Sequence, residues 1–191
     1  MNDILKILID SGAILEGHFL LTSGRHSNKY VEKFRLIEKP EYLDIVCKAM
    51  AKKFLDQNVN VVLGAAIGGI LISGGVGHKL NVKHIFTERV NGNMKLRRGF
   101  FLNEKSNVLI VEDIVTTGGS IFELIDIVKE NKANLIGITS ILDRNEKPVD
   151  FGFNYEPLVQ YSVESWHEDE VPEWLNKIPI TKPGRSGKKQ L

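Results

Sequence analysis

The stretch that decides the fold runs Val108-Leu109-Ile110-Val111-Glu112-Asp113-Ile114-Val115-Thr116-Thr117-Gly118-Gly119-Ser120. Its apolar start, Val108 to Val111, is too short for a buried helix and, with Asn107 before it, predicts a strand over 107–111. Apolar residues then recur at helical spacing, at Ile121, Leu124, Ile125 and Val128. The order therefore predicts a buried strand, followed by two acids, then a turn rich in glycine and hydroxyls, and then an amphipathic helix.

The same alternation of strand and helix extends to both sides of this stretch. Helical spacing covers 41–56 and 70–80, and short apolar runs cover 59–63, 84–87 and 135–142. Near-continuous apolar strands alternating with helices predict an α/β fold, with a mostly parallel central sheet covered by helices on both faces. We expect this core to span 37–149.

The two ends of the chain have a different pattern. Residues 1–36 and 150–180 hold short segments in which polar and apolar residues alternate, such as 159–163. We expect the two ends to form a small hood beside the sheet. The basic, glycine-containing stretch 181–191 is expected to be a flexible tail.

The residues of the turn favour binding of a sugar phosphate. Glycines and hydroxyls at a helix start offer N–H and O–H donors to a phosphate dianion, and the helix dipole adds to the attraction. Glu112 and Asp113 would repel a phosphate, but they suit sugar hydroxyls or a hydrated Mg²⁺. The alternative is an ordinary tight turn in which Thr116 or Thr117 caps the helix.

Three further segments are candidates for ligand binding. The loop Ala65-Ala66-Ile67-Gly68-Gly69 follows a buried strand, and its small residues suit either a diphosphate or close packing of helix on strand. The polar, basic loop 88–99 could bring cations to a ligand or form a solvated hairpin. Arg144 follows the strand 135–142 and could bind a carboxylate or lie in solvent.

Composition excludes several classes of function. The net charge of +1 gives no bulk attraction to nucleic acid, and the longest apolar run, 61–72, is too short to cross a bilayer. The single cysteine excludes a disulfide framework and a zinc site built on paired cysteines, and the five histidines lack ligand spacing. The N-terminus lacks a basic signal region. We expect a cytoplasmic protein that binds neither nucleic acid nor membranes.

The segment 108–120 resembles the phosphoribosyl diphosphate-binding motif of the type I phosphoribosyltransferases. Other segments are similar to the orotate phosphoribosyltransferases, namely Ser23-Gly24-Arg25 in the hood, Leu142-Asp143-Arg144, and the C-terminal 178–184. Together they cover nearly the whole chain. The resemblance implies transfer of ribose 5-phosphate to orotate, with Mg²⁺ held mainly through the substrate, by a homodimer.

The resemblance also implies roles for individual residues. Glu112 and Asp113 would hold the ribose diol, and Ile114, Val115, Thr116, Thr117, Gly118, Gly119 and Ser120 would line the site of the 5-phosphate. Orotate would be bound by Thr116, Arg144, Ser23 and Gly24, and the diphosphate by the loop 65–69. Asp113, Arg89 and Lys95 would be the catalytic residues, with Arg89 also binding the sugar diphosphate.

The chain departs from the family's pattern at its cations. Glu88 stands where the better-known enzymes have the first cation of their mobile loop, and no Lys-x-His follows. Ile67-Gly68 replaces a Tyr-Lys in the diphosphate loop, and Thr22 replaces the lysine before Ser-Gly-Arg. Two alternatives stay open: a phosphoribosyltransferase that salvages a purine or uracil, and a non-catalytic sensor of the sugar diphosphate, for which the missing Lys-x-His is the reason.

Overall fold

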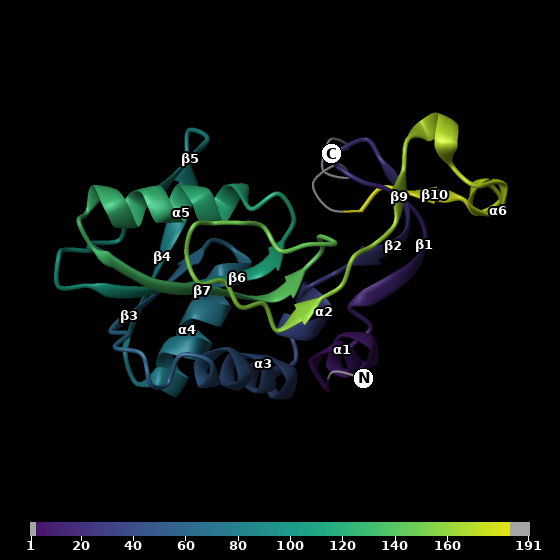
Figure 1. The fold of residues 1–191 in the computed structure, drawn as a ribbon. Coiled ribbons are helices and arrows are strands. Elements are labelled where there is room, and N and C mark those ends of the chain that lie inside the picture. The colour runs from purple at the N-terminus through teal and green to yellow at the C-terminus, as the bar shows by residue number, and fades with distance from the viewer. Residues whose placement is uncertain (1–2, 184–191) are drawn as a thin grey trace.

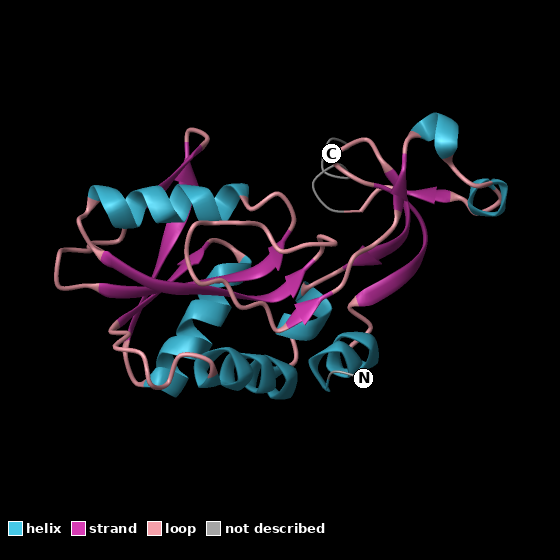
Figure 2. Cartoon of the chain, in the orientation of Figure 1, coloured by secondary structure: helices cyan, strands magenta, loops and turns pink. Residues whose placement is uncertain are grey.

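A computed structural model describes residues 3–183, and it contains two sheets joined by helices (Figures 1 and 2). The larger sheet has six strands in the order β5-β4-β3-β6-β7-β8. These strands are β3 (Val61–Ala65), β4 (Lys83–Val90), β5 (Asn93–Leu96), β6 (Asn107–Val115), β7 (Asn134–Asp143) and β8 (Val159–Gln160). All neighbours are parallel except β4 and β5, which form an antiparallel hairpin at one edge. The expected mostly parallel sheet is confirmed.

Helices cover both faces of this sheet, as the sequence predicts. Helix α5 (Gly119–Glu130) lies on one face, and α3 (Pro40–Lys52) and α4 (Gly68–Leu80) lie on the other (Figure 1). The side chains of β6 alternate between the two layers of the core. Val108 and Ile110 pack in the cluster that includes α5, whereas Leu109 and Val111 pack in the cluster that includes α3 and α4. A central strand buried on both faces needs such an unbroken apolar run.

The hood is a second, four-stranded sheet in the order β10-β1-β2-β9. It combines β1 (Ile14–Leu20) and β2 (His26–Val31) with β9 (Ser165–Trp166) and β10 (Ile180–Thr181), so both ends of the chain contribute. The short helix α6 (Glu173–Asn176) and a 3-10 turn (Glu168–Glu170) connect the last two strands. Helix α2 (Phe34–Ile37) leads from β2 to the core (Figure 1).

Two segments expected in the hood pack on the core instead. Helix α1 (Asp3–Asp10) buries Ile4 and Leu8 in the cluster that holds Val46 of α3. Strand β8 extends the larger sheet, where Val159 pairs with Leu142. The apolar face of α1 and the free edge of β7 both require a partner, and local alternation of residues does not reveal which sheet provides it.

The strand expected over 107–111 continues to Val115, so Glu112 and Asp113 lie within it. Its ladder with β7 extends to the pair Val115–Asp143. Thr181, which was expected in the tail, lies in β10 and pairs with Phe19 of β1. Residues 184–191 of that expected tail lie outside the described residues. Within 3–183, no helix has both the length and the apolar character needed to cross a membrane.

Candidate active site

The turn after β6 forms an open cradle of backbone at the start of α5. Gly118 is the residue before the helix, with φ of 77°, and no side chain caps the first N–H groups of α5. Neither Thr116 nor Thr117 acts as the cap that an ordinary turn would use. The turn opens on a cavity of about 270 Å³. The cavity is lined by residues of β6, the turn and α5, together with Arg89: Glu112, Ile114, Val115, Thr116, Thr117, Gly118, Gly119, Ser120, Ile121 and Glu123.

The two acids of β6 lie beside this cradle and are both buried. Asp113 is 3% exposed, and its Oδ1 accepts a hydrogen bond from the N–H of Ile114 at 2.6 Å. Glu112 is 8% exposed, and its Oε1 accepts from the N–H of Asp113 at 2.9 Å. Burial, and next the neighbouring Asp113 carboxylate, raise the pKa of Glu112 to about 8. A buried pair of this kind can accept hydrogen bonds from hydroxyls or approach a cation.

The loop 65–69 meets the acid pair from the neighbouring strand. Gly64 of β3 pairs with Val111 of β6, so the two loops leave the sheet side by side at its carboxyl edge. A Cβ at Gly68 would overlap Oδ2 of Asp113, so only glycine permits this approach. Ile67 is 74% exposed, and the Ala66–Ile67 peptide bond is cis. Close packing explains Gly68, while the exposed loop remains open to a ligand.

Arg144 is held close to the cradle by the loop that follows β7. Its N–H donates to the carbonyl of Val115 at 3.0 Å, and Nδ2 of Asn145 donates to the carbonyl of Thr116 at 2.6 Å. Burial lowers the pKa of the Arg144 guanidinium. Its Nε is buried and has no hydrogen-bond partner among residues 3–183. A buried guanidinium donor without an acceptor is suited to an anionic ligand.

The basic loop 88–99 forms the β4–β5 hairpin, and two of its cations, Arg89 and Arg98, are held by acids. Arg89 lines the cavity at the cradle, and its Nη2 lies 2.6 Å from Oε1 of Glu123 on α5. Arg98 makes two hydrogen bonds of 2.9 Å to Glu88. Lys95 is exposed on the hairpin and lines a different groove. The structure therefore brings Arg89 to the cradle but leaves Lys95 apart from it.

Ser23 and Gly24 occupy the exposed turn between β1 and β2. Gly24 has φ of 80°, and its N–H donates to the carbonyl of Leu21 at 2.9 Å. Arg25 reaches across the hood, where its Nε donates to Oγ of Ser165 at 2.9 Å. The hydrogen bonds of this turn thus lie within the hood, and its assignment to a bound base stays a prediction.

Lys33 is the residue of this site that the sequence reasoning missed. It follows β2, and its ammonium lies 2.5 Å from Oδ2 of Asp113. Tyr30, three residues earlier, lies within electrostatic reach of both Lys33 and Arg144. In the sequence, the signal that could have indicated Lys33 was its place just after a strand, three residues after Tyr30. It was weak because the two acids are about 80 positions further along the chain.

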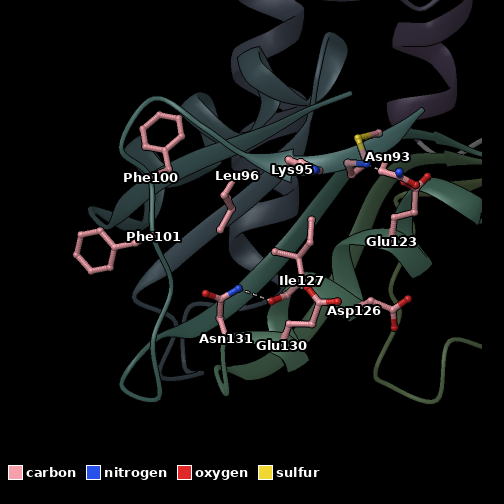
Figure 3. A pocket seen from close by; sticks show the side chains of 11 residues that line it. Asn93, Lys95, Leu96, Phe100, Phe101, Glu123, Asp126, Ile127, Glu130 and Asn131 are labelled. Carbon is pink, nitrogen blue, oxygen red and sulfur yellow. Dashed lines mark hydrogen bonds between the residues drawn. The ribbon is translucent and has the colours of Figure 1, made fainter. Parts of the chain in front are cut away.

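A larger groove lies between the hairpin and the outer face of α5 (Figure 3). Its volume is about 540 Å³, and α5 contributes Glu123, Asp126 and Glu130 to its lining. Lys95 and Phe100 come from the hairpin and the segment after it (Figure 3). Three carboxylates disfavour a phosphate, so the smaller cavity at the cradle is the better candidate despite its size.

Comparison with known proteins agrees with this geometry. A model of the phosphoribosyl transferase domain matches residues 35–170. An orotate phosphoribosyltransferase of Caldicellulosiruptor saccharolyticus is 42% identical over 180 residues, which cover 94% of each chain. One from Thermotoga maritima is 44% identical over 186 residues, which cover 97% of this chain and all of the relative.

Solved structures share the fold at lower identity. The orotate phosphoribosyltransferase of Aeropyrum pernix has a TM-score of 0.71 and 22% identity, over 82% of this chain and 93% of that one. An adenine phosphoribosyl transferase of Trypanosoma brucei, solved with AMP, pyrophosphate and ribose-5-phosphate, has a TM-score of 0.58 and 19% identity. The matched region covers 73% of this chain and 67% of the adenine enzyme. The fold alone therefore does not select the base.

Proposed function

This chain belongs to the orotate phosphoribosyltransferases of the phosphoribosyl transferase domain family, and from that premise we propose that it transfers ribose 5-phosphate from 5-phosphoribosyl 1-diphosphate to orotate. The products are orotidine 5'-phosphate and diphosphate, as in pyrimidine biosynthesis. The observation that carries the proposal is the pairing of an uncapped helix start with two buried carboxylates on one strand. These two features suit the phosphate and the hydroxyls of a single ribose 5-phosphate.

In the proposed complex, the 5-phosphate lies on Thr116–Ser120 and the ribose hydroxyls face Glu112 and Asp113. The support is that Glu112 and Thr116–Ser120 line the same cavity, and Asp113 follows Glu112 on β6. Gly118 has a φ of 77°, which suits glycine, and it has no side chain that would cover the backbone N–H groups from the anion. Arg89 adds a cation to the same cavity. The diphosphate lies on the loop 65–69, which meets Asp113 through Gly68.

Orotate lies between the sugar and Arg144 in this proposal. The guanidinium offers a fork of donors that matches a carboxylate, and its Nε is buried without a partner among the described residues. Thr116 adjoins the same place, since its carbonyl accepts from Asn145. Uracil lacks the carboxylate, so this arrangement favours orotate over uracil. Purine transfer remains the second candidate, and a panel of bases tests it.

The chemistry is a displacement at the anomeric carbon. The bond from that carbon to the diphosphate oxygen breaks, with its electron pair leaving on the diphosphate, and a ring nitrogen of orotate forms the new bond. The nitrogen's proton passes to water or to the departing diphosphate. The residues of the chain act mainly by holding the two substrates in line and by opposing the charge that develops.

Mg²⁺ fits this site as an ion held mainly through the substrate. Glu112 and Asp113 are two adjacent buried carboxylates, and residues 3–183 contain no cluster of three or more His, Cys, Asp or Glu side chains that could hold a metal. When bound with the substrate, the ion would draw charge from the leaving group. Asp113 would face the ion or the hydroxyls that it binds.

We also propose that the enzyme works as a cytoplasmic homodimer. The support is the family resemblance, which places a cationic loop of one subunit near the site of its partner. In this chain the corresponding hairpin is exposed at the edge of the sheet, where Arg97 and Lys95 face solvent. Sedimentation at assay concentration tests the proposal, and a fully active monomer would contradict it.

The decisive assay follows the absorbance of orotate after mixing with 5-phosphoribosyl 1-diphosphate, Mg²⁺ and protein. We expect orotate to be consumed, and uracil, adenine, guanine and hypoxanthine to be left unchanged under the same conditions. Asp113→Asn should lower turnover by about tenfold or more, because an amide binds hydroxyls and cations less strongly than a carboxylate. Consumption of a purine without consumption of orotate would overturn the proposed substrate.

A further inference from the structure

Lys33 stands at the junction of the acid pair and the diphosphate loop. Its ammonium lies 2.5 Å from Oδ2 of Asp113. A Cβ at Gly68 would overlap the same oxygen, so the backbone of the loop 65–69 approaches it as well. One carboxylate oxygen thus lies against both a cation from the hood side and the start of α4 from the core side.

The backbone of Lys33 is held in place, while the end of its side chain is accessible. Its carbonyl accepts hydrogen bonds from the N–H groups of Leu36 and Ile37, at 3.0 Å each. Leu36 and Ile37 are 1% and 3% exposed, so they anchor α2 in the core. The Lys33 side chain is 34% exposed, against 5% for that of Asp113. A ligand can therefore reach the ammonium without unfolding the segment that carries it.

The cations of the hairpin have other partners or positions, and Arg144 is assigned to orotate. Arg89 is bound by Glu123, Arg98 is bound by Glu88, and Lys95 lies on the separate groove. The lysine expected in the diphosphate loop is Gly68 in this chain. Beside that loop, Lys33 is the cation that the described contacts place on the acid pair.

We propose that Lys33 is a substrate-binding cation that leaves Asp113 when the sugar diphosphate binds and then contacts the diphosphate. The inference rests on the proposed function. When ribose hydroxyls or their bound cation take the Oδ2 side of Asp113, the ammonium loses its partner. The closest incoming anion is the diphosphate on the loop 65–69, because that loop already adjoins the same oxygen. In this role Lys33 only binds, and it transfers no proton.

This role differs from a purely structural one in the ligand that it affects. A structural tie between hood and core would influence all ligands of the site together. A cation for the diphosphate affects the diphosphate and leaves the 5-phosphate cradle unchanged, because that cradle is built from the backbone of 116–120 and Lys33 is not among the residues that line its cavity. Binding of two separate probes therefore separates the two roles.

The test compares Lys33→Met, Lys33→Arg and Lys53→Met by calorimetry with inorganic diphosphate plus Mg²⁺, and separately with ribose 5-phosphate. Lys53 is a matched control, since its side chain is 32% exposed and its ammonium lies 3.0 Å from Glu156. Lys33→Met should weaken diphosphate binding by about tenfold or more and change ribose 5-phosphate binding by less than about threefold. Lys33→Arg should largely restore diphosphate binding, and Lys53→Met should behave like the wild type.

Diphosphate binding by Lys33→Met within about threefold of the wild type would overturn the inference. Equal weakening of both probes would also overturn it, in favour of a structural role. If Lys33→Met fails to fold, Lys33→Gln carries the same comparison, because it keeps a donor for Asp113. A wild-type protein that binds diphosphate through Lys33 but consumes no orotate would refute the proposed function alone, so the two failures are distinguishable.

Discussion

Arg89 and Glu123 form an ion pair, with Nη2 of the arginine 2.6 Å from Oε1 of the glutamate, and both side chains line the cavity at the cradle. The other carboxylate oxygen of Glu123 accepts the N–H of Met94 at 2.9 Å. Glu123 thus fastens the β4–β5 hairpin to α5, and Arg89 lowers the pKa of its carboxyl. The Glu123 carboxylate places a negative charge where the site would receive a phosphate.

Replacing Glu123 by glutamine should tighten the binding of ribose 5-phosphate several-fold, because a negative charge leaves the cavity and Arg89 is freed to meet the phosphate. The free energy of unfolding should fall by about 1 kcal/mol or less, since the pair is partly exposed and screened by solvent. Calorimetry and chemical denaturation measure the two effects. Glu130→Gln, on the same helix but lining only the other groove, is the control, and equal affinities in the two variants would contradict the prediction.

Gly118→Ala should destabilise the protein by about 1–3 kcal/mol and weaken ribose 5-phosphate binding. The residue has φ of 77°, and an added Cβ would lie 2.7 Å from Cε1 of Phe151. The matched variant is Gly119→Ala, where the nearest atom to the added Cβ is Oγ1 of Thr117 at 3.8 Å. Its stability should be close to that of the wild type. Equal loss of stability in the two variants, measured by denaturation, would show that the strained turn is not the cause.

Glu112 should make the ligand-free protein less stable as the pH rises. Its pKa is raised by burial and by Asp113 to about 8, whereas in an unfolded chain it is about 4.3. Between these values the folded state binds a proton that the unfolded state has released, so rising pH favours unfolding. The free energy of unfolding should therefore fall between about pH 5 and about pH 8. Glu112→Gln should remove this part of the slope, and an unchanged slope would contradict the prediction.

Arg144→Lys should raise the KM for orotate by about tenfold or more, because an ammonium lacks the fork of donors that binds a carboxylate in a bidentate manner. The buried Nε of Arg144, without a partner among residues 3–183, is the structural reason to expect this. Steady-state kinetics with varied orotate measures the effect. Arg35→Lys is the control, since Arg35 is exposed and its Nη1 donates to the carbonyl of Gly12 at 3.3 Å. An unchanged KM in Arg144→Lys would remove Arg144 from the orotate site.

The sequence predicts the sheet and the cradle because their signals are local. The apolar run before Glu112, the turn and the spacing after Ser120 lie within a single stretch, and the burial of β6 and α5 follows from it. The β4–β5 hairpin was one of two open alternatives for its loop, and the structure has the hairpin. The position of Arg144 beside the cradle follows from the parallel register of β6 and β7.

What the sequence does not reveal depends on contacts between distant residues. The docking of α1 on the core, the pairing of β8 with β7 and the contact of Lys33 with Asp113 all join positions far apart in the chain. The stretch 159–163 alternates in the same way whether it pairs in the hood or in the larger sheet. Glu123, the partner of Arg89, lies 34 positions away, so this ion pair could not be predicted from the local sequence either.

The most direct measurement is a crystal structure of the protein with ribose 5-phosphate bound. We expect phosphate density against the backbone of Thr116–Ser120, with the ribose hydroxyls within hydrogen-bonding distance of Glu112 or Asp113. Density for the phosphate on the loop 65–69 instead, or an absence of ligand at the start of α5 at a saturating concentration, would contradict this expectation.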